Sequence, residues 1–304
     1  MTAAAYLLGY GALVTWCAPA LLTRLTRRGL SPRLGIAAWL TAIAGVLLAW
    51  AAAATLLVAA VVTGFGDSRA LVLCLELLGV PERVATPGLF SVLVVIVAWM
   101  VITTVVAVRV SRAVRGSRRR SHRHAEAARL VGVPTDRRDV FVITAQQPAA
   151  YCVVGRPDAI VVTSAAVEVL DESQLAAVLA HEDAHIAGRH HHVLMVLRAL
   201  SASLRRLPLF TRGAVAVGQL LEMCADDAAA RRHGARPLVA GMVMLAAPVP
   251  AAGLGVAATG VAVRANRLLT PAHRGALWCH QLAMATMIAG LISTPVIVNL
   301  VCRH

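Results

Sequence analysis

The sequence predicts a mainly α-helical integral membrane protein, in which four membrane-spanning helices accompany one polar unit of helices and short strands. Composition is the first observation behind this prediction: 59% of the 304 residues are hydrophobic, 14% are charged, and the mean hydropathy is +0.73. A water-soluble domain of this composition would have too few polar side chains to cover its surface, and intrinsic disorder requires low hydrophobicity. The other two observations are a set of long uncharged stretches and an arginine-rich segment between the last two of them.

Four stretches have the roughly 20 apolar residues that an α-helix needs to cross a bilayer. They lie within residues 275–304 and, inside the N-terminal region 1–108, at about residues 1–23, 36–63 and 86–108. Arginines come after the first apolar run rather than before it, which favours a retained helix over a cleaved signal peptide. Another uncharged run, 237–263, contains three prolines and four glycines and is predicted to form two short helices and a turn.

Arginine placement predicts the orientation of these helices in the cell (inner) membrane. Segment 109–274 carries 22 arginines against 12 acidic residues, and the linker 24–33 carries four arginines and no acidic residue. The linker 67–83 has more acidic than basic residues. Because excess arginine marks the cytoplasmic side, we expect the N-terminus outside the cell and segment 109–274 in the cytoplasm.

The basic run from Arg112 to Arg123 has two interpretations. It could contact anionic lipid headgroups beside the membrane, or it could bind nucleic acid. The run follows a membrane span directly, and neither a recognition-helix motif nor stacking aromatic residues accompany it. We therefore expect the lipid bilayer as a partner and no direct binding of nucleic acid.

Segment 109–274 is long enough to form one domain with its own core. Its first part contains three short stretches rich in β-branched residues, at 140–144, 150–154 and 159–163. Glycine, proline and aspartate lie between these stretches, so the pattern predicts three strands in a small meander.

Two helices are predicted after the strands. Asp171 and Gln174 have the spacing of a capping box, and apolar residues then recur on one helical face, which predicts a helix from Glu172 to Arg206. A second helix is expected over 214–232, because Gly234 stands where a terminating glycine belongs.

The first predicted helix contains the sequence His181-Glu182-Asp183-Ala184-His185. Residues four apart share a helix face, so the imidazoles of His181 and His185 converge on one point. Zinc binds neutral imidazole nitrogens at about 2.0–2.1 Å, and this spacing supplies two of them. We expect Glu182 to be the general base, which takes a proton from a zinc-bound water and passes it to the leaving amine.

A hydrolytic zinc site needs a third protein ligand, and the second predicted helix supplies a candidate. We assign Glu222 as the third ligand of one Zn²⁺ per chain, and Asp226 as the group that accepts the far ring N–H of His181. The alternative is a solvated polar turn, because His-Glu-x-x-His sequences also arise by chance. The capped apolar helix and the acidic pair on a second helix favour zinc, since such side chains are costly to bury unless they coordinate something.

The sequence leaves several other roles open. His233 and Arg264 are candidate oxyanion stabilisers. Tyr151 and Cys152 lie on a strand that either binds an extended substrate at its edge or packs as an ordinary core strand. The histidines His190–His192 form either a polar helical turn in contact with the ligands or an auxiliary metal site.

These motifs, in this order, resemble the membrane gluzincin peptidases, and they are most similar to the antirepressor metallopeptidases of the BlaR/MecR type. The resemblance covers residues 135–235 and includes the three spans before this segment and the one after it. It implies a zincin-like α+β metalloprotease domain in 109–274, with His181, His185 and Glu222 as zinc ligands. The HtpX-like and CAAX prenyl proteases share the zinc motif and are the nearest rivals.

The resemblance further implies a zinc metalloendopeptidase that cleaves a cytoplasmic transcriptional repressor, such as a winged-helix protein, and thereby takes part in signalling. These 304 residues hold no penicillin-binding sensor domain, so we expect no direct β-lactam sensing. The alternatives are a quality-control membrane protease of the HtpX or CAAX type and a non-catalytic membrane metal-binding protein. The sequence leaves open whether the chain forms oligomers.

Overall fold

The computed structural model describes residues 3–62, 89–246, 256–270 and 272–301. The long apolar helices are α1 (Ala3–Thr26), α2 (Pro32–Val62), α4 (Leu89–Val131) and α11 (Arg274–Val301). Four strands and six shorter helices lie between α4 and α11 among the described residues: β1 (Val133–Pro134), β2 (Val140–Ile143), β3 (Ala150–Val153), β4 (Ala159–Thr163), α5 (Ser164–Val169), α6 (Glu172–Ala187), α7 (His190–Ser203), α8 (Pro208–His233), α9 (Ala235–Ala246) and α10 (Val256–Leu269).

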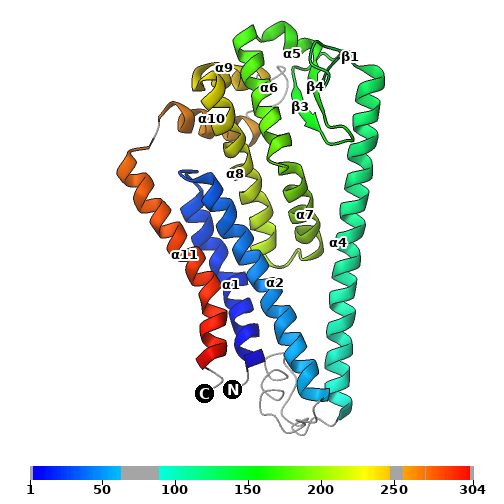
Figure 1. The fold of residues 1–304 in the computed structure, drawn as a ribbon, viewed down its shortest axis with the longest axis vertical. Helices are drawn as coiled ribbons and strands as arrows, with labels where there is room; N and C mark the ends of the chain where they lie inside the picture. The colour runs from blue at the N-terminus through cyan, green and yellow to red at the C-terminus, as the bar shows by residue number, and fades with distance from the viewer. Residues whose placement is uncertain (1–2, 63–88, 247–255, 271, 302–304) are drawn as a thin grey trace.

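Each of the four predicted membrane spans corresponds to a helix that is long and apolar enough to cross a bilayer. These candidate spans are Ala3–Thr26, Pro32–Ala59, Ile96–Val131 and Arg274–Pro295. Helices α1, α2 and α11 run side by side, and both chain termini lie at the end of the molecule opposite the sheet (Figure 1). The predicted fold class, a mainly helical membrane protein with a small sheet, is confirmed.

Helix α4 continues without a break from its apolar stretch through the arginine-rich run that follows. The sequence predicts a span that ends near residue 108, but no proline interrupts residues 109–131, and arginine and alanine are good helix formers. The far end of α4 reaches the sheet, where Ala125 is fully buried in one cluster with Val153 and Val161. Thus α4 is a single rod that joins the membrane region to the sheet (Figure 1).

The sheet is mixed, and the predicted meander is wrong. Its strand order is β1-β2-β4-β3, with β2 parallel to β4 and β3 antiparallel to β4. All five residues of β4 are buried, whereas three of the four residues of β3 are only half-buried. The most buried strand therefore lies in a central position, where both of its edges are paired, and β3 lies at the edge of the sheet.

The single helix predicted over 172–206 is two helices, because the chain turns at Gly188 and Arg189. Arg189 has a left-handed backbone with φ of 50°, which ends the α-helical path. A Cβ at position 188 would lie 2.3 Å from Nε2 of His190, so a larger residue there would have to displace the His190 ring. Helix α7 consequently starts at His190 in a new direction.

The run 237–263 forms helical segments, as predicted, and does not span the membrane as one helix. Helix α9 ends at Ala246 and α10 begins at Val256, and the proline-containing turn between them lies outside the described residues. Helix α8 begins with Pro208 in its first turn and ends before Gly234, which has φ of 87°. Helix α8 therefore begins at Pro208, six residues before the predicted start at residue 214, because proline is favoured in the first turn of a helix.

The largest buried cluster joins the membrane helices to the polar unit, and three smaller buried clusters lie wholly within segment 109–274. The cluster combines residues of α1, α2 and α11 with residues of α7 and α8. Phe210 at the start of α8 is fully buried, with its ring centroid 6.1 Å from that of Trp50 on α2. The physical reason is that the apolar side chains of α8 cover α1 and α2 on one side while its polar side chains face α6.

We predict that Phe210→Ala destabilises the protein by about 3–5 kcal/mol, because truncation of a buried aromatic side chain leaves a cavity. The free energy of unfolding can be measured by denaturant titration in detergent micelles. Val215→Ala on the same helix is the control, since Val215 is 63% exposed and its truncation should change stability by less than about 0.5 kcal/mol. Equal effects of the two substitutions would contradict a core shared between the membrane helices and α8.

Candidate metal centre and active site

Helix α6 holds the two predicted histidine ligands in a fixed position. It begins with the predicted capping box: Asp171 accepts from the backbone N–H of Gln174 at 2.9 Å, and the Gln174 side chain accepts in return from the Asp171 N–H. Val178 packs in the cluster beneath the sheet, and Ala177 in a cluster shared with α8 and α9. This packing on two sides buries His181 and Glu182, which are 8% and 9% exposed.

The structure brings His181, His185 and Glu222 together. Their donor atoms all lie within 4.8 Å of one another, and no other group of three such ligands is found among the described residues. The two Nε2 atoms are 3.1 Å apart, and the carboxylate oxygens of Glu222 lie 3.6 Å from Nε2 of His181 and 3.5 Å from Nε2 of His185. Zinc bonds of 2.0–2.1 Å at tetrahedral angles would place neighbouring ligand atoms about 3.3–3.4 Å apart. The spacing therefore fits a zinc ion with two nitrogen ligands and one oxygen ligand.

Asp226 occupies the predicted position behind His181. The Asp226 side chain is fully buried, and its Oδ1 lies 3.1 Å from Nδ1 of His181. Burial alone would raise the pKa of Asp226, but hydrogen bonds from Arg264 and His181 outweigh it and lower that pKa. An ionised Asp226 orients the ring so that Nε2 of His181 faces the other ligands.

Arg264 anchors the acidic groups of the centre. It donates from Nε and Nη2 to the two oxygens of Asp226 at 2.7 and 2.6 Å, and its Nη1 lies 3.1 Å from Oε2 of Glu222. Burial opposes the charge of Arg264, yet its acidic partners raise its pKa. The sequence analysis predicts Arg264 as a candidate oxyanion stabiliser. In the structure its guanidinium instead contacts Asp226 and Glu222.

The two ligating histidines differ in protonation when no metal is bound. Burial disfavours the charged form of His181, but Asp226 and Glu222 outweigh this effect and raise its pKa to about 9. Burial and the charge of His181 together lower the pKa of His185 to about 4, against the attraction of Glu222. A metal ion must therefore displace one proton, from His181, to be bound by both imidazoles.

Glu182 lies beside the three ligands but points to the sheet. Its Oε2 accepts from the backbone N–H of Cys152 at 2.8 Å. Burial raises the pKa of Glu182, although the neighbouring His181 favours its charged form. A carboxylate with a raised pKa that is fixed at one oxygen can accept a proton at the other and release it again.

Strand β3 presents its free edge to this centre, because the N–H of Cys152 points away from β4. Tyr151 faces the opposite way, toward α4, where its hydroxyl lies 3.3 Å from Nε2 of His124. Only the backbone of the predicted edge strand and Cys152 thus adjoin the centre. Burial and the nearby Glu182 raise the pKa of the Cys152 thiol to about 12.

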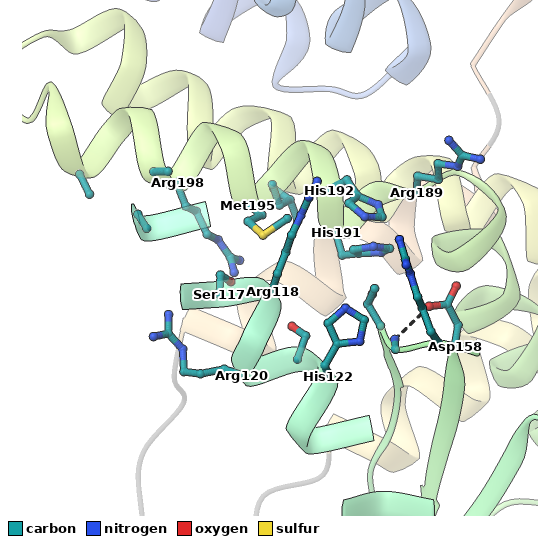
Figure 2. A pocket seen from close by; sticks show the side chains of 18 residues that line it. Ser117, Arg118, Arg120, His122, Asp158, Arg189, His191, His192, Met195 and Arg198 are labelled. Atoms are coloured by element: carbon teal, nitrogen blue, oxygen red, sulfur yellow. Dashed lines mark hydrogen bonds between the residues drawn. The ribbon is translucent and has the colours of Figure 1, made fainter. Parts of the chain in front are cut away.

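The three consecutive histidines separate at the start of α7. His190 is buried and its Nδ1 lies 2.9 Å from Nδ1 of His185, so it contacts a predicted ligand from behind. His191 and His192 point into a different cavity (Figure 2). The sequence analysis included a contact between these histidines and the ligands as one possibility. The turn at Gly188 makes the contact of His190 with His185 possible, because a continuous helix would place His190 beyond the ligands.

His233 is not part of the centre. It is exposed at the end of α8, eleven residues beyond Glu222 on the same helix. At a rise of 1.5 Å per residue this is a separation of about 16 Å along the helix axis. His233 therefore does not adjoin the three donor atoms, and its position does not support the expected role as an oxyanion stabiliser.

A cavity adjoins the centre, and no sequence pattern predicted it. Glu222 lines a cavity of about 640 Å³ between α7 and α8, whose polar walls include Arg198 and Gln219. Arg137 was also missed: it binds Asp183 of α6 through two hydrogen bonds of 2.8 and 3.1 Å, and so ties the β1–β2 turn to the ligand-bearing helix. A contact across 46 residues has no local sequence pattern.

Comparison with known proteins identifies one family. The sequence model of Peptidase family M48 matches residues 115–266, which is half of the chain. The matched segment includes α6, α8 and most of α10, and hence every residue of the centre described above. No curated protein and no solved structure matches the chain.

We predict that Asp226→Asn lowers zinc affinity roughly 10- to 100-fold, because the substitution removes the charge that orients His181. Affinity can be measured by competition with a chelator of known zinc affinity. The control is Asp227→Asn, the same change at the next position, where the carboxylate accepts from Arg267 at 2.6 Å. Comparable zinc affinities in the two variants would show that Asp226 does not support the metal centre.

Proposed function

The chain belongs to Peptidase family M48, and from that premise we propose that it is a zinc-dependent membrane endopeptidase that cleaves a cytoplasmic protein. Membership and the four apolar helices establish a membrane-type metallopeptidase. The observation that carries the finer proposal is the position of Glu182, which is buried beside a three-donor cluster and held at the edge of the sheet. A site that only stored or transported metal would have no need of this carboxylate.

Different residues of the centre would bind the metal, transfer the proton and position the ligands. His181, His185 and Glu222 would hold the zinc ion, which when bound supplies a Lewis acid that polarises a peptide carbonyl and makes water easier to deprotonate. Glu182 would take the proton of the attacking water at its carboxylate and deliver it to the leaving nitrogen. Asp226 and Arg264 keep the ligands in place, and Arg264 also offsets the negative charge of Glu222.

An extended substrate would bind along the free edge of β3. Edge strands recognise extended peptides through backbone hydrogen bonds, and the side chains then select the sequence. The N–H of Cys152 links this edge to Glu182, so a peptide on the edge would have its backbone next to the general base. This placement supports an endopeptidase, because both ends of the peptide could extend past the centre.

We propose a transcriptional repressor as the substrate, and a centre that faces the cytoplasm. The motif resemblance over residues 135–235 supports the repressor, and the arginine excess of segment 109–274 supports the orientation. The termini lie at the end of the molecule opposite the sheet, as this orientation requires (Figure 1). The alternative of a quality-control protease would act on many membrane proteins rather than on one repressor.

We predict that Glu182→Gln retains zinc and lowers peptide-bond cleavage about 10²- to 10⁴-fold, the usual contribution of a general base. The purified variant would be compared with wild type by metal analysis and by digestion of casein and of candidate repressors. Glu172→Gln is the matched control, because Glu172 is exposed at the start of the same helix. A Glu182→Gln enzyme with normal cleavage would refute the proposed mechanism, and loss of zinc would show a structural role instead.

We also predict the membrane orientation from reporter fusions. Green fluorescent protein fused after Gly29, between α1 and α2, should fluoresce because this loop is expected in the cytoplasm. Alkaline phosphatase fused after His304 should be active, because that end is expected outside. The reverse pattern of activities would place the metal centre outside the cytoplasm and exclude a cytoplasmic repressor as its substrate.

A further inference from the structure

A second cavity, of about 730 Å³, lies between α4 and α7 and is strongly basic. Figure 2 shows side chains of α4, among them Arg118 and His122, on one side and side chains of α7, among them His191 and Arg198, on the other. Five arginines line this basic cavity: Arg118, Arg120, Arg156, Arg189 and Arg198. Asp158 is its only acidic lining residue, so the cavity has a large excess of positive charge.

The positive charge of the basic cavity is not neutralised within the described part of the chain. No carboxylate there forms an ion pair with any of the five arginines, and Oδ1 of Asp158 accepts from the backbone N–H of Gly155 at 3.0 Å. Both ring nitrogens of His191 and Nδ1 of His192 are buried without a hydrogen-bond partner among the described residues. Clustered arginines and unpartnered buried ring nitrogens beside the start of α7 indicate that an anion belongs here.

The position of the basic cavity favours a lipid as the source of that anion. Ala113, at one end of the cavity, is five residues beyond Val108, the last residue of the apolar stretch of α4, or about 8 Å along the helix. One wall is apolar, formed by Leu194, Met195 and Ala199 of α7. None of the apolar window of α4 is buried within the molecule, so bilayer lipid can contact this helix up to the cavity.

We propose that the basic cavity binds the phosphate group of an anionic phospholipid. The arginines would bind the phosphate, and the apolar wall would contact the glycerol and the upper acyl chain. A bilayer supplies this ligand at high local concentration, whereas an acidic protein segment would have no use for the apolar wall. The site is separate from the metal centre, and its occupancy does not depend on peptidase activity.

The test uses full-length protein purified in a neutral detergent and titrated by calorimetry. The probes are dihexanoyl phosphatidylglycerol, dihexanoyl phosphatidylcholine, inorganic phosphate and a short acidic peptide, which separate an anionic lipid from a zwitterionic lipid, a free anion and an acidic protein segment. The cavity variant carries Arg118→Gln and Arg198→Gln. The matched control carries Arg119→Gln and Arg123→Gln, which remove the same charge from exposed positions of α4 that do not line the cavity.

We expect phosphatidylglycerol to bind wild type and the control with affinities within about twofold, and the cavity variant roughly 30-fold more weakly, a change of about 2 kcal/mol. Phosphatidylcholine and inorganic phosphate should bind at least about tenfold more weakly than phosphatidylglycerol. Equal losses in the cavity variant and the control would overturn the proposal, as would inorganic phosphate binding as tightly as the lipid, or displacement of the lipid by an acidic peptide. If the cavity variant does not fold, Arg118→Lys with Arg198→Lys takes its place, and retention of charge should then preserve most of the binding.

Discussion

The ion pair between Asp226 and Arg264 is the constraint on which the metal centre depends. Asp226 is fully buried, and a buried carboxylate is tolerated only when its charge is matched and its oxygens are hydrogen-bonded. Arg264 meets this requirement with two short hydrogen bonds, and His181 takes the remaining contact. The interaction therefore locks α6, α8 and α10 together, and the positions of the three donor atoms follow from that arrangement.

Helix α8 links the metal centre to the membrane. Its first half is buried against α1 and α2, where Phe210 and Leu209 are fully enclosed, and its second half carries Glu222 and Asp226. Because one rigid helix both packs against α1 and α2 and carries Glu222 and Asp226, it fixes the distance between the metal centre and the apolar helices. The polar unit is consequently packed directly against the apolar helices through α8.

The turn at Gly188 divides two kinds of polar site. Before it, α6 carries the proposed metal ligands and the proposed general base beside acidic side chains. After it, α7 places histidines and Arg198 in the basic cavity. His190 stands at the junction, because it starts α7 and contacts His185. An anion bound in the basic cavity beside α7 would offset the positive charge of the arginines that line it.

The sequence alone determined the four membrane helices, the helix boundaries marked by Asp171 and Gly234, and the pairing of His181 with His185 on one helix face, because these depend on local composition and on helical periodicity. It also nominated Glu222 and Asp226, since their spacing repeats the same geometry. The sheet order, the break at Gly188 and the partner of Arg264 could not be predicted, because each depends on which distant segments pack together. Burial decided them: all five residues of the central strand β4 are buried, and Arg264 pairs with Asp226, 38 residues away in the chain, because a buried carboxylate has to be neutralised.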